Sequence, residues 1–165
     1  MRRLTLLIGG AFLATIASAG TSDVNARWFD YRNCDFCKQW AMQPGLIEHS
    51  HDECHNISDG IIWVESVDAG YRNQYAKTLA AEQNVLSDLQ AGKPVSMCRY
   101  CSAINDFSRK GVRIESVSSD AGEEITIYTS SDSTLVKQIQ SFGLQAIGEL
   151  ARANAAFVAG QKKGK

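Results

Sequence analysis

Residues 98–129, with the sequence CRYCSAINDFSRKGVRIESVSSDAGEEITIYT, decide the fold. Their first part predicts a short helix that ends at Gly111. Residues 112–117 and 124–128 then alternate apolar with polar side chains around a turn at 120–122, which is typical of a β-hairpin. From Leu135 onwards, large apolar residues recur at helical spacing. This half of the chain therefore predicts the order helix, strand, strand, helix.

An offset of 64 residues aligns this half with the part of the chain that precedes it. Cys34-Asp35-Phe36-Cys37 then aligns with Cys98-Arg99-Tyr100-Cys101, since 98 − 34 = 64. Residues 61–64 supply the stronger strand of the first half, and residues 71–89 have the spacing of its long helix. Identities are few, but further positions agree in kind: Ile61 with Ile125, Ser66 with Ser130, Asp68 with Asp132, Gln74 with Gln138, and Leu86 with Leu150. The shared order predicts an internal duplication.

The predicted fold class is therefore α+β. It consists of two tandem α-β-β-α repeats whose antiparallel hairpins pack against helices and can share one sheet. The predicted boundaries are a signal peptide at 1–19, a lead-in at 20–33, a first half at 34–93, a second half at 94–156 and a basic, solvated tail at 157–165.

The first 19 residues have the pattern of a secretory signal peptide. Arg2 and Arg3 precede an apolar run at 4–16, and Ala17-Ser18-Ala19 supplies small residues for cleavage. The apolar run is shorter than the roughly 18 residues that span a bilayer, and no cysteine follows Ala19 directly. We therefore expect a periplasmic or secreted protein without a stable membrane anchor.

Charge and motifs exclude several classes of function. The formal net charge of −1 becomes −3 when the two arginines leave with the signal, so no strong basic field attracts nucleic acid. The sequence contains no G-x-S-x-G nucleophile motif, P-loop or dinucleotide-binding glycine fingerprint. These observations favour a protein that is not an enzyme. If it is one, a thiol-disulfide oxidoreductase fits its cysteines.

The five cysteines carry the main chemical signal. Two CxxC pairs, Cys34 with Cys37 and Cys98 with Cys101, each lie near the start of a predicted helix, where the helix dipole favours a thiolate. Thiolates bind soft cations and attack disulfides. If the two halves are equivalent, four sulfurs can converge on one tetrahedral site. Structural disulfides and thiol-disulfide exchange remain open alternatives for the same residues.

All three histidines of the chain lie beside the fifth cysteine, in His49-Ser50-His51-Asp52-Glu53-Cys54-His55. Neutral imidazole and thiolate are common ligands of zinc and copper. We therefore treat His49, His51, Cys54 and His55 as candidate metal ligands together with the four CxxC cysteines. A histidine-rich surface loop with a buried or dimer-forming Cys54 is the alternative.

These patterns lead to one functional hypothesis and two alternatives. The first is an exported soluble protein that carries, buffers or senses Zn or Cu, with the metal ion as its partner. The second is an extracytoplasmic thiol-disulfide redox protein that uses Cys34 and Cys37 or Cys98 and Cys101. The third is a non-catalytic module whose cysteines form structural disulfides.

Overall fold

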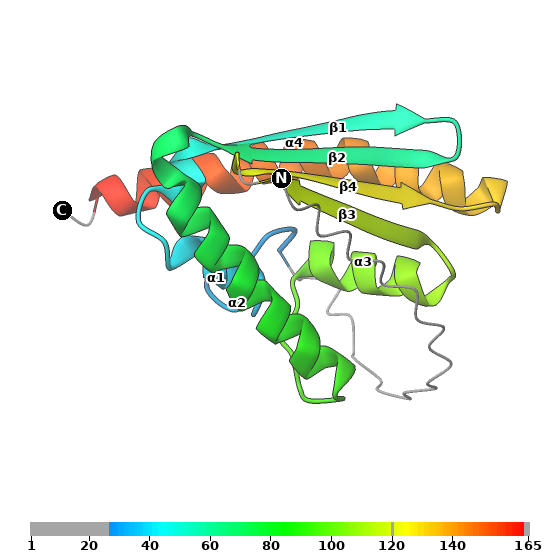
Figure 1. Ribbon diagram of the computed structural model, residues 1–165, viewed down its shortest axis with the longest axis horizontal. Coiled ribbons are helices and arrows are strands. Elements are labelled where there is room, and N and C mark those ends of the chain that lie inside the picture. Colours follow the sequence, from blue (N-terminus) through cyan, green and yellow to red (C-terminus); the bar gives the residue numbers. More distant parts are fainter. Residues whose placement is uncertain (1–26, 120, 164–165) are drawn as a thin grey trace, which may run out of the picture.

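The computed structural model describes residues 27–119 and 121–163 as a mixed α+β fold with one four-stranded antiparallel sheet (Figure 1). The predicted signal peptide at 1–19 lies outside the described residues. Among the helices that are described, none has the length and apolar character needed to cross a membrane.

The first half of the fold contains two strands between helices. Its elements are helix α1 (Cys37–Ala41), the 3-10 helix η1 (Leu46–His49), strands β1 (Ser50–Ile57) and β2 (Gly60–Val67), the 3-10 helix η2 (Ala69–Tyr71) and helix α2 (Arg72–Gln90). The predicted repeat places a strand before β2, but the sequence did not locate it at β1. Its residues are mostly polar because it lies at an edge of the sheet, where it buries little apolar surface.

The second half repeats this order of elements. It contains helix α3 (Arg99–Arg109), strands β3 (Arg113–Ser119) and β4 (Glu123–Thr129), and helix α4 (Ser133–Lys163). α4 includes residues 157–163, where we expected a solvated tail. Phe157 packs against Tyr31 at 5.1 Å between ring centroids, and Lys162 pairs with Glu48, so contacts with the lead-in and the first half accompany this helical extension.

The two hairpins share one sheet in the order β1-β2-β4-β3. β2 pairs with β4 at the centre of the sheet, where Ile62 lies opposite Ile127 and Trp63 opposite Thr126. The two hairpins differ in register: Ile57 lies opposite Gly60 in the first, whereas Ser119 lies opposite Glu123 in the second. The order of elements is therefore shared without an equal register, and the duplication stays a prediction.

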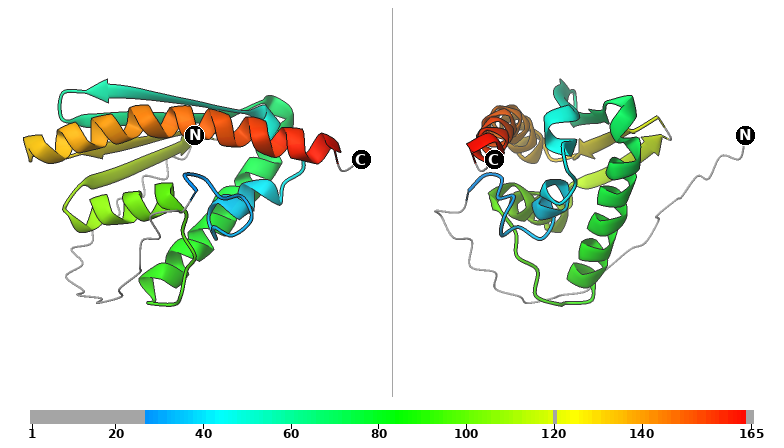
Figure 2. Two further views of the ribbon diagram at one scale, coloured as in Figure 1. Left: turned by 180° about the vertical axis from the view of Figure 1, so that it is seen from behind. Right: turned by 90° about the vertical axis from the view of Figure 1, so that its left-hand side faces the viewer.

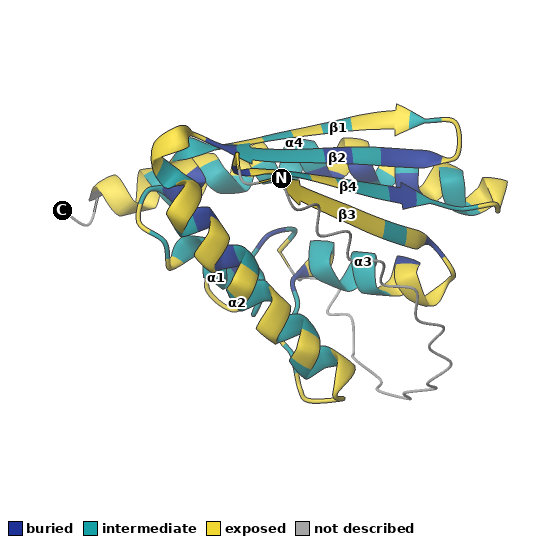
Figure 3. Ribbon diagram, viewed as in Figure 1, coloured by how far each residue is buried: buried dark blue, intermediate teal, exposed yellow. Residues whose placement is uncertain are grey.

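The core lies between one face of the sheet and the helices. Ile61 and Trp63 of β2 and Tyr128 of β4 pack with Phe107 of α3 and Ile139 of α4. Figure 2 shows α4 running along the sheet, and Figure 3 shows β3 exposed over most of its length. A second buried cluster joins this core at Trp28 and Tyr100, and it contains the cysteines.

Candidate metal centre

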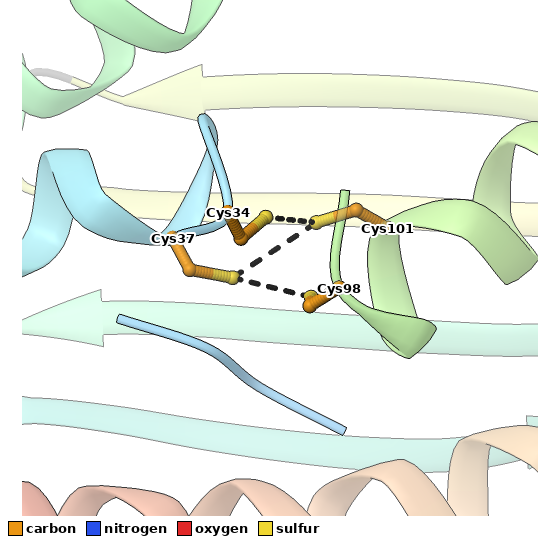
Figure 4. A group of neighbouring side chains, drawn as sticks. All are labelled: Cys34, Cys37, Cys98 and Cys101. Carbon is orange, nitrogen blue, oxygen red and sulfur yellow. Dashed lines mark hydrogen bonds between the residues drawn. The ribbon is translucent and has the colours of Figure 1, made fainter. Parts of the chain in front are cut away.

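Four sulfurs from the two halves of the chain gather at one point (Figure 4). The Sγ atoms of Cys37 and Cys98 are 3.5 Å apart, those of Cys34 and Cys101 are 3.6 Å apart, and those of Cys37 and Cys101 are 3.9 Å apart. All four Sγ atoms lie within 4.8 Å of one another. The two CxxC pairs therefore form one group, as their equivalent positions in the sequence predict.

The spacing of these sulfurs suits tetrahedral coordination of a cation. With Zn–S bonds of about 2.3 Å, neighbouring sulfurs of a tetrahedral site are about 3.8 Å apart. The three sulfur–sulfur separations lie close to this value. A disulfide needs sulfurs about 2.0 Å apart, whereas the shortest of the three separations is 3.5 Å. The group consequently has the dimensions of a four-thiolate metal site, and its cysteines are unpaired.

Backbone hydrogen bonds hold the two CxxC segments against each other. The N–H of Asp35 donates to the carbonyl oxygen of Ser96 at 2.8 Å, and the N–H of Ser96 donates to the Asp35 carboxylate at 2.7 Å. The local turns are also alike: Lys38 N–H donates to the oxygen of Cys34, and Ser102 N–H donates to the oxygen of Cys98. These contacts hold the two cysteine pairs close to each other.

Apolar side chains enclose the four cysteines. Cys34 is 1% exposed and Cys98 is 3% exposed, and Phe29 is buried in the same cluster. Phe29 stacks on Tyr100 with their ring centroids 4.7 Å apart, while Leu150 and Ala153 of α4 pack against the cluster. Three of the four cysteines are buried and Cys101 is partly exposed, and the sulfurs face mainly one another.

Hydrogen bonding among the sulfurs lowers the pKa of one cysteine and raises the pKa of another. Contact with Cys101, and then with Cys37 and Cys98, holds the pKa of Cys34 well below its usual range. The pKa of Cys101 is raised well above its usual range, first by its hydrogen bond with Cys34. Metal ligands must be deprotonated, so cation binding at these cysteines is coupled to the release of protons.

Half-buried carboxyl groups lie between the sheet and α2, on the side of the fold that holds the cysteines. Burial raises the pKa of Glu82 to about 8, and its Oε1 accepts a hydrogen bond from the Trp40 indole at 3.0 Å. Glu65 accepts a hydrogen bond from the Tyr75 hydroxyl at 2.7 Å, and burial, then the charge of Asp52, raises its pKa. These carboxyl groups are stabilised in their neutral form.

This environment predicts a pH dependence of stability at Glu82. Its folded-state pKa of about 8 lies above the ordinary value of 4.5. The neutral carboxyl therefore contributes stability that is fully present below pH 4.5 and is lost as the pH rises through about 8. We expect Glu82→Gln to match the wild type at pH 4 and to exceed its free energy of unfolding at pH 9 by on the order of 2 kcal/mol.

Urea unfolding at both pH values measures this difference. Glu123→Gln, which changes an exposed carboxylate of β4, is the matched control and should show the same difference from wild type at both pH values. If Glu82→Gln and Glu123→Gln differ from the wild type by the same free energy of unfolding at both pH values, then ionisation of Glu82 does not destabilise the fold.

The histidine-rich stretch occupies η1 and β1, and its side chains do not join the cysteine group. His49 and His51 both contact Asp68, and His55 contacts Glu53, all at the surface. Among the described residues, the four CxxC cysteines are the only group of three or more possible metal ligands whose donor atoms all lie within 4.8 Å of one another. The predicted ligands His49, His51 and His55 therefore lie apart from the four sulfurs.

Cys54 also lies away from this group, in the core between β1 and α4. It packs with the cluster that contains Ile61, and a Cβ added at Gly143 would lie 2.7 Å from its Sγ. Alternation along a strand places Cys54 on the sheet face opposite to His51 and His55. The thiol and these imidazoles consequently cannot bind the same ion. Burial raises the pKa of Cys54.

Sequence reasoning missed one contact that positions the candidate site. The pairing of Asp35 with Ser96 was not predicted, because a hydrogen bond across 61 residues leaves no local pattern. The only available signal was that Asp35 lies inside the first CxxC motif and Ser96 lies two residues before the second.

The fold and the site together define an α+β protein with a buried four-cysteine cluster that is compatible with metal binding. Comparison with known proteins finds no matching family model, curated sequence or solved structure.

Proposed function

We propose that this protein binds one Zn²⁺ ion through Cys34, Cys37, Cys98 and Cys101 and is an exported zinc-binding protein. The observation that supports the proposal is the convergence of four sulfurs within 4.8 Å. Zinc is favoured over copper because a tetrahedral set of four thiolates is typical of Zn or iron-sulfur centres. The predicted signal peptide supports a periplasmic or secreted location.

The closed geometry favours holding zinc over performing catalysis with it. Four protein ligands fill a tetrahedral site, whereas catalytic zinc keeps one position for water or substrate. The ligands come in equal numbers from the two halves, so a bound ion links segments that the chain separates by more than 60 residues. Binding therefore couples zinc to the stability of the fold, which suits a zinc buffer or a sensor of zinc supply.

The second candidate is thiol-disulfide chemistry, which the facing cysteine pairs favour. Cys37 lies 3.5 Å from Cys98 and Cys34 lies 3.6 Å from Cys101, so oxidation in an oxidising compartment has two partners available across the halves. Such cross-links would fasten the same segments that zinc joins. We rank this candidate second because all four sulfurs lie close together, whereas a disulfide needs only two.

Cobalt titration of the reduced protein tests the proposal. We expect one equivalent of Co²⁺ to produce tetrahedral absorption bands and an intense thiolate-to-metal charge-transfer band, and one equivalent of Zn²⁺ to abolish both. Cys37→Ser should weaken binding at least about 100-fold, whereas the control Cys54→Ser should bind like the wild type. An octahedral spectrum, or equal loss in both variants, would contradict the four-thiolate site.

A further inference from the structure

Two imidazoles and one carboxylate meet at the surface where η1 joins β1. Nδ1 of His49 lies 2.7 Å from Oδ2 of Asp68, and Nε2 of His51 lies 3.1 Å from Oδ1 of the same carboxylate. The three residues lie at the open end of the first hairpin, on both of its arms. They are separate from the four-cysteine group, and their capacity to bind a cation does not depend on zinc binding there.

The backbone brings these three residues together. Ser50 lies opposite Val67 and His51 opposite Ser66, so His49 and Asp68 are the next pair beyond the end of the ladder. The N–H of Asp68 donates to the carbonyl oxygen of His49 at 3.0 Å, which continues the pairing. The His49 ring also stacks on Tyr71 with ring centroids 4.1 Å apart. The hairpin therefore presents His49 and Asp68 at fixed backbone positions.

The distances between these groups suit ligands of one cation. With metal-ligand bonds of about 2.0–2.1 Å, two ligands at right angles are about 2.9 Å apart. The two nitrogen-oxygen separations, 2.7 Å and 3.1 Å, lie on either side of this value. The three donor atoms are not all within 4.8 Å of one another, so an imidazole must turn to complete the site. Both rings are exposed enough to do so: the His49 side chain is 37% exposed and that of His51 is 62% exposed.

The charge of the group also suits a cation. Hydrogen bonds from His49, and then from His51, hold the pKa of Asp68 below its usual range, so this carboxylate is ionised at neutral pH. Two neutral imidazoles and one carboxylate are ligands that Cu²⁺ and Zn²⁺ accept, and Cu²⁺ binds such sets most tightly among the divalent first-row metals.

We propose that His49, His51 and Asp68 form a second metal site, exposed and exchangeable, for a divalent first-row cation such as Cu²⁺ or Zn²⁺. It differs from the cysteine group in having three ligands, so water or a ligand from another molecule completes its coordination. Its nitrogen and oxygen donors are harder than thiolate and select divalent copper or zinc over Cu⁺.

Electron paramagnetic resonance with Cu²⁺ tests this site. The protein used is the full chain with Cys54→Ser, loaded with one equivalent of Zn²⁺, and native mass spectrometry of each sample shows which metals it holds. If no zinc is retained, the thiols are first blocked by alkylation under denaturing conditions and the chain is refolded, with circular dichroism to verify the fold. We expect one equivalent of Cu²⁺ to give a tetragonal spectrum with hyperfine splitting from two imidazole nitrogens.

Single-residue variants locate the signal. His49→Ala and His51→Ala should each remove one nitrogen from the splitting and weaken Cu²⁺ binding by about 100-fold, and Asp68→Ala should weaken it at least about 10-fold. His55→Ala, which changes a histidine of the same strand that contacts Glu53, is the matched control and should leave both readouts unchanged. Loss of the spectrum in His55→Ala, or its persistence in His49→Ala and His51→Ala, would overturn the proposal.

Discussion

Substitution of Cys37 by serine is expected to lower the free energy of unfolding by about 4 kcal/mol, measured with free zinc about 1,000-fold above its dissociation constant. Cys37 is buried, and its sulfur lies within 4 Å of those of both Cys98 and Cys101. A serine hydroxyl is a poor ligand for zinc, so the variant loses the metal that joins the two halves. The corresponding fall in Tm is about 15 °C for a domain of this size.

A chelator separates loss of metal from loss of packing. In the wild type, removal of zinc should lower the free energy of unfolding by the same amount as the substitution, while in Cys37→Ser it should change nothing further. Cys54→Ser is the control, since Cys54 is a half-buried cysteine outside the group. If the chelator destabilises Cys37→Ser as much as the wild type, the cysteine group is not where the stabilising metal binds.

The second large effect is expected from Gly60→Ala, which tests the sheet that joins the two halves. Gly60 opens β2 and lies opposite both Ile57 of β1 and Thr129 of β4. A Cβ added at this position would lie 1.7 Å from the carbonyl oxygen of Tyr128 and 3.1 Å from the Cα of Thr129. Both contacts are with backbone atoms, so no side-chain rotation relieves them and the strands must move apart.

We expect this movement to lower the free energy of unfolding by about 3 kcal/mol and Tm by about 10 °C. Gly70→Ala is the matched control, because a Cβ at Gly70 would meet no atom within 4 Å. Urea unfolding of both variants, with the m-value as a check on two-state behaviour, measures the difference. Equal stabilities would mean that β2 and β4 do not pair as described at Gly60.

The sequence predicted the positions of the elements in which apolar residues recur at a regular spacing. It did not locate β1, in which they do not. The two long helices have regular apolar spacing because each buries one face. The hairpin at 112–128 alternates apolar with polar residues, although β3 is exposed over most of its length. β1 lacks this spacing, since its neighbour β2 carries most of the burial on that side of the sheet. Leu46 and Ile47, which precede β1, are buried in η1, so their apolar character reflects burial in the core and not a strand.

The candidate cysteine site was predictable in outline because its ligands occur as two motifs at equivalent positions. The 64-residue offset made convergence of the sulfurs a geometric expectation, and the four Sγ atoms do converge. The histidine stretch was less predictable, because contacts across strands decide its partners. Asp68, which contacts His49 and His51, lies 19 residues from the first and 17 from the second, and no spacing rule links them.

X-ray absorption spectroscopy of the zinc-loaded protein tests the central claim most directly, since it reports the ligands of the metal itself. We predict a first coordination shell of four sulfur atoms at about 2.3 Å, with no nitrogen or oxygen ligand. The shell should be unchanged in His49→Ala and His51→Ala when one equivalent of zinc is bound. A shell dominated by nitrogen and oxygen, or with two sulfurs or fewer, would contradict the four-cysteine site.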